Sequence, residues 1–353
     1  MKKVGFLALA AVTLFASCKT DNQAEADKYG GTLRVNISDI PHVVFPGRIN
    51  KRSEQIIAYQ VYDGLVKYNP RTLKIVPSIA KKYRVSGDNL TYTFTIDSRA
   101  RFQDSRCFKR GKGRRIVAAD VKYSIEQVCR IQLLNEYEKS RQIMNIEGAE
   151  EFMKTAKTND SIDIGGIIAK DDTTLIFKLL KPDNLFIHYL AGPNTLVFAQ
   201  EAFNTYGING TAGSGAYMIK YPTIKGQPIE LTKNKKYWRT TYQGEQLPFL
   251  DTIIISFVTS TQKELYMFEK DMVDVVFGVP VKYLTPFLEE NIDAFQSATP
   301  QFTMTQTINL QNDKRFNLLK SNIKGLYINS QDFFDFSEVY LQEPEPRTIV
   351  VSE

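Results

Sequence analysis

The residues that could carry catalysis or bind a metal are few in this chain of 353 residues. Its two histidines, His42 and His188, are not clustered. The sequence contains neither a Gly-x-Ser-x-Gly nucleophile motif nor a phosphate-binding glycine loop. Asp171 and Asp172 could serve in acid–base catalysis, but two strand-like runs flank them, and a turn is the favoured structure there. We therefore expect no enzymatic activity, no cofactor and no metal site.

The first eighteen residues have the pattern of an export signal that ends at a cysteine. Lys2 and Lys3 precede an apolar run over residues 4–14, which is too short to span a bilayer. Small residues at positions 16 and 17 indicate cleavage before Cys18 and lipid attachment to its sulfur, although Phe15 stands where such lipoproteins more often have Leu. An ordinary secretory signal is the alternative. We expect a lipoprotein signal peptide over residues 1–17, a tether over 18–28, and a membrane-anchored protein in the periplasmic space of a bacterial cell envelope.

The other two cysteines, Cys107 and Cys129, would be allowed to form a disulfide in that compartment. The sequence does not place their Cα atoms within the roughly 4.4–6.8 Å that a disulfide requires. Cys129 lies on a predicted helix, where a buried free thiol is the usual state. Both the paired and the free states therefore stay open.

The charge pattern argues against a nucleic-acid partner. The formal net charge is +6, and the positive residues are spread along the chain. The densest positive run covers residues 106–115 and predicts a solvated surface, with contact to anionic lipid as the alternative.

The hydrophobic periodicity predicts strands and helices that interleave along the chain. Strands are predicted over residues 32–37, 253–258 and 274–277, helices over 54–66, 118–134 and 261–269, and hairpins over 81–96 and 164–179. Such interleaving indicates a mixed α/β architecture.

Several segments, in this order, resemble the extracellular solute-binding proteins of peptide and nickel ATP-driven importers. The matching segments are residues 29–35, 61–70 with 75–80, 88–94, 101–104 with 111–114 and 118–124, 213–217, 231–238, and 321–329 with 333–337. The resemblance implies a periplasmic-binding-protein type II-like fold, mixed sheets with helices in two lobes on a hinge, and no catalysis. Family members are longer, so we expect one complete lobe and a truncated second lobe, with most of the second lobe missing between about residues 301 and 317.

On this resemblance we divide the chain into three parts. Residues 29–75, 186–260 and 317–343 would form the first lobe, residues 76–185 a subdomain inserted into it, and residues 261–316 the remnant of the second lobe. The implied function is that of the lipid-anchored component of an importer, which captures a short peptide or other small solute and delivers it to permease subunits. The partners would be the solute, the permease and membrane lipid, and the protein would be a monomer.

The candidate ligand-binding residues lie in or shortly after three of these segments. Ser38, Asp39 and His42 follow the first strand, where the ligand-facing loop of the family begins; Asp39 could pair with an amine and His42 could donate to a carboxylate. An ordinary surface loop is the alternative. Tyr217 and Trp238 complete the set, Trp238 as a stacking surface, with a buried aromatic corner as the alternative.

Two glycines near Tyr217 admit a ligand-binding and a structural interpretation. Gly213 and Gly215 could offer backbone N–H groups to a ligand, but a tight crossover of the chain is the favoured interpretation. A rival function for the whole chain also remains, because the expected loss of a lobe leaves an open half-site. The rival is a truncated, non-transporting envelope lipoprotein that acts as an interaction or structural protein.

Overall fold

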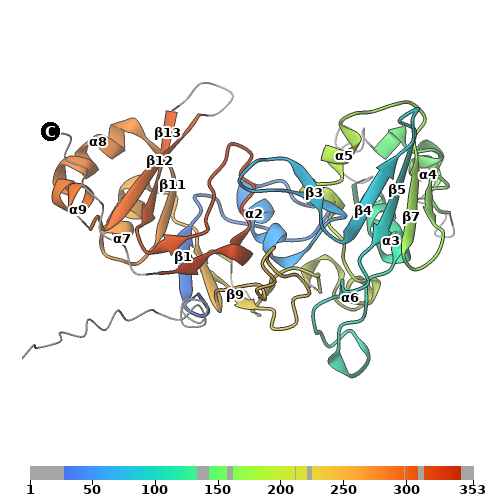
Figure 1. The fold of residues 1–353 in the computed structure, drawn as a ribbon, viewed down its shortest axis with the longest axis horizontal. Coiled ribbons are helices and arrows are strands. Elements are labelled where there is room, and N and C mark those ends of the chain that lie inside the picture. The colour runs from blue at the N-terminus through green and yellow to red at the C-terminus, as the bar shows by residue number, and fades with distance from the viewer. Residues whose placement is uncertain are drawn as a thin grey trace, which may run out of the picture.

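A twisted sheet of seven strands occupies the middle and one end of the molecule (Figure 1). The computed structural model describes residues 28–132, 143–156, 162–210, 212–220, 225–297, 299–308 and 314–342, so Cys18 and the expected signal peptide lie outside the described residues. The strand order, from one edge to the other, is β12 (Phe302–Ile308), β13 (Lys314–Lys320), β11 (Val275–Pro280), β1 (Thr32–Asn36), β10 (Thr252–Ser256), β9 (Ile229–Lys233) and β8 (Tyr217–Ile219).

The central strand β1 is parallel to both of its neighbours. Val35 lies opposite Ile255 of β10 on one side and Val275 of β11 on the other. After β10, helix α7 (Thr261–Glu269) carries the chain across β1 to β11. Strands β8 to β10 therefore lie on one side of β1, and the chain continues on the other side from β11. Because β1, β10 and β11 are parallel, their carboxyl ends lie at the same end of the sheet.

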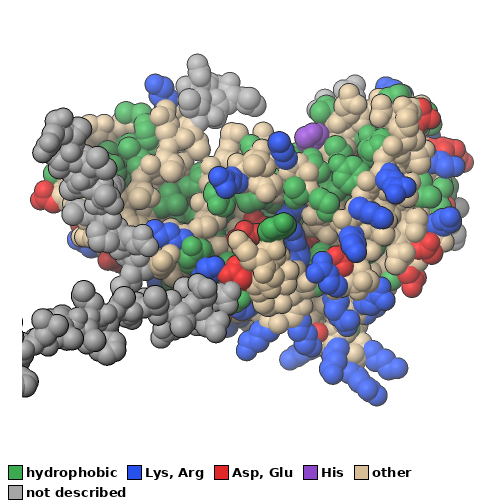
Figure 2. Space-filling model, in the orientation of Figure 1, with side chains coloured by type: hydrophobic (Ala, Val, Ile, Leu, Met, Phe, Trp, Pro, Cys, Tyr) green, Lys and Arg blue, Asp and Glu red, His purple; other side chains and the backbone are tan. Residues whose placement is uncertain are grey.

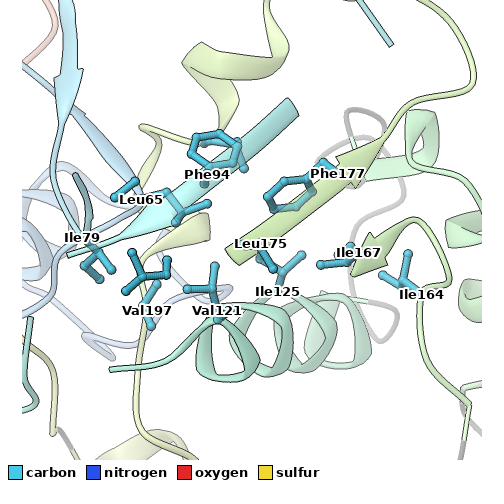
Figure 3. Packing of buried hydrophobic residues seen from close by; sticks show 14 of the residues in the cluster. Leu65, Ile79, Phe94, Val121, Ile125, Ile164, Ile167, Leu175, Phe177 and Val197 are labelled. Carbon is cyan, nitrogen blue, oxygen red and sulfur yellow. The ribbon is translucent and has the colours of Figure 1, made fainter. Parts of the chain in front are cut away.

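A second sheet of four strands lies at the opposite end of the molecule (Figure 1). Its order is β4 (Ala80–Val85), β5 (Thr91–Ile96), β7 (Thr174–Lys178) and β6 (Ile167–Ala169), all antiparallel. Helix α3 (Ala118–Gln132) covers one face, where Val121 and Ile125 point at Leu175 and Phe177 (Figure 3). The alternating burial of β5 and the helical spacing on α3 explain this packing.

The remaining elements are short and connect the two sheets or cover them. The helices are α2 (Arg52–Val61), α4 (Ala149–Thr155), α5 (Phe186–Tyr189), α6 (Gln200–Tyr206), α8 (Val281–Glu290) and α9 (Ile292–Gln296). The strands are β2 (Val66–Tyr68), β3 (Ile75–Pro77), β14 (Ile323–Lys324) and β15 (Tyr340–Leu341). Single 3-10 turns lie at Lys109–Gly111, Ile143–Asn145, Pro193–Thr195, Gly207–Asn209 and Phe336–Glu338.

Most elements predicted from periodicity are confirmed. The helix expected over residues 261–269 has those bounds, and both predicted hairpins form antiparallel pairs. The helix expected over residues 54–66 begins at Arg52 and ends at Val61, because residues 62–65 are extended or irregular. No helix among the described residues combines the length and the apolar character that crossing a membrane requires.

The sequence suggested a missing lobe at residues 301–317. These residues contain strand β12 and the first part of strand β13, which form a hairpin. Strands β12 and β13 pair antiparallel, with Thr303 opposite Leu319 and Thr307 opposite Arg315. Residues 309–313, between the two strands, are outside the described residues. Helices α7 and α8 and this hairpin bury one of the three hydrophobic clusters, with Phe268 and Phe302 near its centre.

Candidate functional site

A cavity of about 360 Å³ opens where the parallel strands end. We call it the strand-end cavity. Ser38 follows β1, Thr259 follows β10, and Gly278 and Pro280 belong to the end of β11. The other lining residues come from α2, α7, β11, β12, β13 and the segment before the C-terminal 3-10 turn: Arg52, Thr261, Glu264, Phe277, Thr307, Arg315, Asn317, Ile328, Asn329, Ser330 and Asp332. In open sheets with parallel strands, ligands bind at such strand ends, where the chain reverses its order of connection.

The wall of the cavity is held by a hydrogen-bond network around Asn36, the last residue of β1. The amide nitrogen of Asn36 donates to the Val258 carbonyl at 2.9 Å and to Glu264 Oε1 at 2.8 Å, and its amide oxygen accepts from the Val258 N–H at 2.7 Å. Asn36 is fully buried and Glu264 is 6% exposed. Burial raises the pKa of Glu264 to about 7, against the smaller opposing effects of Asn36 and Arg52.

Arg52 also lines the cavity and is held by several partners. Its guanidinium donates to Asp332 Oδ1 at 2.8 Å and lies 5.4 Å from the centre of the Phe277 ring and 5.9 Å from that of Phe334. A guanidinium stacked on aromatic rings and paired with a carboxylate has little freedom to move. Arg52 therefore shapes the cavity and brings a positive charge to it.

Four charged residues from distant parts of the chain form a buried ionic cluster, which we define as Asp63, Lys67, Arg239 and Asp335. Lys67 pairs with Asp335, and the Tyr237 hydroxyl donates to Asp63 at 3.3 Å. Burial opposes ionisation of Asp335, but Lys67 and Arg239 outweigh it and hold the pKa of this carboxyl well below its usual range. Burial raises the pKa of Asp63, which the same two cations only partly offset.

Of the five residues predicted to bind a ligand, the structure brings only Ser38 to the strand-end cavity. Asp39 accepts from the Ser53 hydroxyl at 2.7 Å and from its N–H at 3.2 Å, in the first turn of α2. His42 is exposed, and its ring lies 3.1 Å from Lys51 Nζ. The His42 side chain lines a second, more apolar cavity of about 420 Å³ with Val43, Ile219, Phe257 and others.

The other two predicted ligand residues lie inside the protein. Tyr217 is fully buried, and its hydroxyl donates to the Phe336 carbonyl at 3.2 Å. Trp238 packs against two of the hydrophobic clusters, with the guanidinium groups of Arg99 and Arg239 each 5.9 Å from its ring. Ligand roles for these residues stay predictions, and their observed contacts are those of the core and of its borders.

Gly213 and Gly215 serve the structural role that the sequence favoured. A Cβ atom at Gly215 would lie 2.3 Å from the Gln60 carbonyl oxygen, and one at Gly213 would lie 2.1 Å from that of Val61. The Gly215 N–H donates to Val61 at 2.9 Å. Close approach of two backbones, and not access to a ligand, therefore requires glycine at both positions.

The two internal cysteines are free, and the basic run is exposed. Cys129 is fully buried and Cys107 is half-buried. The side chains of Arg106, Lys109, Arg110, Lys112 and Arg115 are exposed, whereas Arg114 pairs with Asp120 at 2.7 Å and Glu201 at 2.6 Å. Figure 2 shows Lys and Arg side chains gathered on the lower right of the molecule. Among the described residues there is no group of three His, Cys, Asp or Glu side chains that could hold a metal ion.

The sequence pattern described as "Bacterial extracellular solute-binding proteins, family 5 Middle" matches residues 74–320. The chain belongs to this family. The match covers the four-stranded sheet, every strand of the seven-stranded sheet except β1, and the residues that line the strand-end cavity on β11 and β13. The resemblance recognised in the sequence is thereby confirmed.

Known proteins match the sequence of this family 5 chain over part of their own length. The glutathione-binding protein GsiB of Salmonella typhi is 26% identical over 238 residues, which are 67% of this chain and 40% of that protein. GsiB of Escherichia coli K12 is 26% identical over 258 residues, 72% of this chain and 43% of that protein. This chain thus spans less than half the length of these relatives.

Solved structures of periplasmic binding proteins also match this chain over about half of their own length. DppA of Helicobacter pylori, in complex with the peptide STSA, superposes with a TM-score of 0.64 at 17% identity and covers 80% of this chain and 52% of its own. OppA of Haemophilus influenzae, in complex with RPPGFSPFR, superposes with a TM-score of 0.64 at 18% identity over 78% and 50%. The expected fold class, mixed α/β of the periplasmic-binding-protein type II kind, is therefore confirmed.

Sequence reasoning missed most of the residues of the strand-end cavity, Glu264, Arg52 and Asn317 among them. One local signal was present for Glu264. It stands four residues before the buried Phe268 and next to the buried Leu265, so a carboxylate falls on the apolar side of a short helix. A charged residue on such a side needs a partner, and this points to the interior of a site.

Proposed function

We propose that this chain binds a small solute, a short peptide or a molecule of similar size, in the strand-end cavity. The observation that carries the proposal is the position of the cavity at the carboxyl ends of β1, β10 and β11, in a chain of the solute-binding family. Its volume of about 360 Å³ is within the usual range for small-molecule sites. Polar side chains and a few apolar ones line it, as directional recognition of a polar solute requires.

The wider role follows from the same family membership. We propose that the protein is held at a membrane outside the cytoplasm through lipid on Cys18 and delivers its solute to the permease of an ATP-driven importer. Similar proteins support solute binding, because GsiB is named for binding glutathione and DppA was solved with a peptide. Because the chain spans about half of those proteins, its own substrate and partners are proposed and have to be measured.

The test is native mass spectrometry of the full chain, mixed at millimolar concentration with a pool of random tripeptides. Retained mass that disappears on denaturation is the expected result. A variant that fills the cavity, Ser38→Trp, should lose the bound mass. Ser98→Trp is the matched control, because both serines are exposed and only Ser38 lines the cavity.

Two outcomes would contradict the proposal. An empty wild-type protein would remove solute binding and favour the rival interaction or structural role. Equal retention by Ser38→Trp and the wild type would place the binding site elsewhere in the chain.

A further inference from the structure

The connection between β5 and α3 carries a dense run of positive charge on the surface. Residues 106–115, which we call the basic loop, contain six Lys or Arg and no Asp or Glu. The loop projects from the lower right of the molecule, below α6 (Figure 1), where Lys and Arg side chains gather (Figure 2). Five of its cations are exposed and form no ion pair with the described residues: Arg106, Lys109, Arg110, Lys112 and Arg115.

The carboxylates that contact the basic loop among the described residues are already paired with other cations. Asp104 accepts from the Gly113 N–H at 2.9 Å and pairs with Lys236 at 2.5 Å. Asp120 and Glu201 both pair with Arg114, the half-buried cation of the loop. The five exposed cations therefore keep a positive charge that the protein does not compensate, and such a surface attracts an anionic partner.

The basic loop is held in one shape by its base and by a buried ring. Arg101 and Arg115 form an antiparallel bridge, and the Phe102 N–H donates to the Arg114 carbonyl at 3.0 Å. The Phe108 ring is 6% exposed and stacks on Phe102, with 5.9 Å between the ring centres. The loop thus turns its aromatic ring inward and its cations outward. Single-stranded nucleic acid is a poor match, because its binding uses exposed aromatic rings on which bases stack.

The basic loop and the start of the tether contact the same short segment of chain. Lys236 pairs with Asp104 at the base of the loop, and Glu245, nine residues later, pairs with Lys28, where the described chain begins. The expected lipid site, Cys18, is ten residues before Lys28, and ten residues span at most about 35 Å. A membrane that holds Cys18 is therefore near enough for the basic loop to meet its surface.

We propose that the basic loop binds the anionic lipid headgroups of the membrane that holds the protein. Clusters of about four to eight Lys and Arg beside a membrane anchor are attracted to such headgroups, and the exposed cations of the loop form a cluster of this size. The contact would place the end of the molecule with the four-stranded sheet against the membrane. This inference goes beyond solute binding, and it rests on the proposed lipid anchor for its geometry.

The experiment measures flotation of the full chain with two kinds of vesicle. One kind contains phosphatidylcholine alone, and the other contains phosphatidylcholine mixed with anionic phosphatidylglycerol. The result is the ratio of the two partition coefficients, because a lipid anchor raises both and leaves their ratio unchanged. A twofold set of variants accompanies the wild type, and thermal unfolding verifies that they fold.

The two variants remove the same number of charges from opposite ends of the molecule. The loop variant is Arg106→Gln/Lys109→Gln/Lys112→Gln, and the control variant is Lys263→Gln/Lys282→Gln/Lys314→Gln. The control residues are matched to those of the loop, because they are exposed and form no ion pair with the described residues. They belong to α7, α8 and β13, which lie far from the basic loop (Figure 1).

We expect the wild type to prefer the anionic vesicles at least about tenfold at low salt, since each Lys or Arg at such a surface contributes about fivefold. The preference should vanish near 0.5 M salt, roughly, because ions screen exposed charges. The loop variant should lose most of the preference and the control variant should keep it.

Four outcomes would overturn the inference. They are equal partition of the wild type into both vesicles, a preference that the loop variant keeps, an equal loss in both variants, and loop-dependent binding of a single-stranded oligonucleotide without preference for anionic vesicles. The last would favour a nucleic-acid partner. The proposed function has separate readouts, since the intact mass reports lipid on Cys18 and native mass spectrometry reports the bound solute.

Discussion

The Lys67 ammonium and the Asp335 carboxylate form an ion pair that joins positions 268 residues apart in the chain. Their side chains are 16% and 13% exposed, so water screens the pair only weakly. The pair fixes the C-terminal segment, which carries Phe334 and Phe336, to strand β2. The same segment continues back to Asp332, which holds Arg52 at the strand-end cavity.

Removing one partner of this pair should cost more stability than removing an exposed pair. We expect Lys67→Met to lower the free energy of unfolding by about 3 kcal/mol, because Asp335 then remains buried with less compensation. The double variant Lys67→Met/Asp335→Leu should lose less than the sum of the two single variants. Urea denaturation at pH 7 measures all three.

Lys220→Met is the control for this series, since Lys220 pairs with Glu230 at 2.8 Å where the two side chains are 60% and 37% exposed. Such a pair contributes about 0–1 kcal/mol. A Lys67→Met variant no less stable than Lys220→Met would mean that the ionic cluster does not hold the C-terminal segment.

Protonation of Asp335 at acid pH should lower the free energy of unfolding of the protein. Its pKa is held below the ordinary value in the folded state, so its contribution is present above the pKa of the unfolded chain, roughly 3.9, and is lost as the pH falls below that value. Asp335→Asn should therefore show a shallower decline of stability between pH 4 and pH 2 than the wild type. Parallel declines in the two proteins would contradict this assignment.

Glu264 should lower the free energy of unfolding as the pH rises, which is the opposite of the effect of Asp335. Its pKa in the folded state is raised to about 7, so its contribution is present below the unfolded pKa and is lost as the pH rises through 7. Glu264→Gln should then be more stable than the wild type at pH 8, by on the order of 3 kcal/mol, and equally stable near pH 4. Thermal unfolding across this pH range measures the difference, with Glu269→Gln as control because Glu269 is exposed on the same helix. A constant difference at all pH values would exclude titration of Glu264 as its cause.

The crossover at Gly215 should not tolerate a side chain. Gly215→Ala places a Cβ atom 2.3 Å from the backbone oxygen of Gln60, so the two segments must move apart, at a cost of about 2 kcal/mol or more. Gly87→Ala should change the free energy of unfolding by less than about 1 kcal/mol, because nothing lies within 4 Å of its Cβ position. Equal stability of the two variants would show that the end of α2 and the segment before β8 can separate freely at Gly215.

The two internal thiols should react with alkylating reagents at different rates. Cys107 is half-buried, whereas Cys129 is fully buried, and burial raises the pKa of both thiols. Maleimide should label Cys107 slowly in the folded protein and Cys129 only after denaturation, as peptide mapping of the two positions would show. Labelling that requires a reductant at both positions would instead reveal a disulfide.

Local chemistry explains why so many elements could be predicted. The alternation of Leu33 and Val35 in β1 and the helical spacing of Val121 and Ile125 in α3 are properties of neighbours in the chain, and the structure buries those residues. The glycines at 213 and 215 were also interpreted correctly, because few roles other than close backbone approach require two glycines so near each other.

The site could not be derived in the same way. Ser38, Asp39 and His42 lie within five residues of the sequence, yet the first lines the strand-end cavity, the second caps α2 and the third lines a different cavity. Which of them faces the cavity depends on where α2 packs against the end of β1. That is a tertiary relationship, and no local periodicity encodes it.

The sequence by itself determined the family, the fold class and the positions of most strands and helices, because these depend on periodicity and on motifs that are local in the chain. Only the tertiary structure decided the cavity, since its lining runs from Ser38 to Asp332 and is assembled by the parallel pairing of β1 with β10 and β11. It also decided the environment of Glu264. In the sequence Glu264 is one acidic residue on a short helix, and it becomes buried and hydrogen-bonded only when Asn36 and the walls of the cavity close around it.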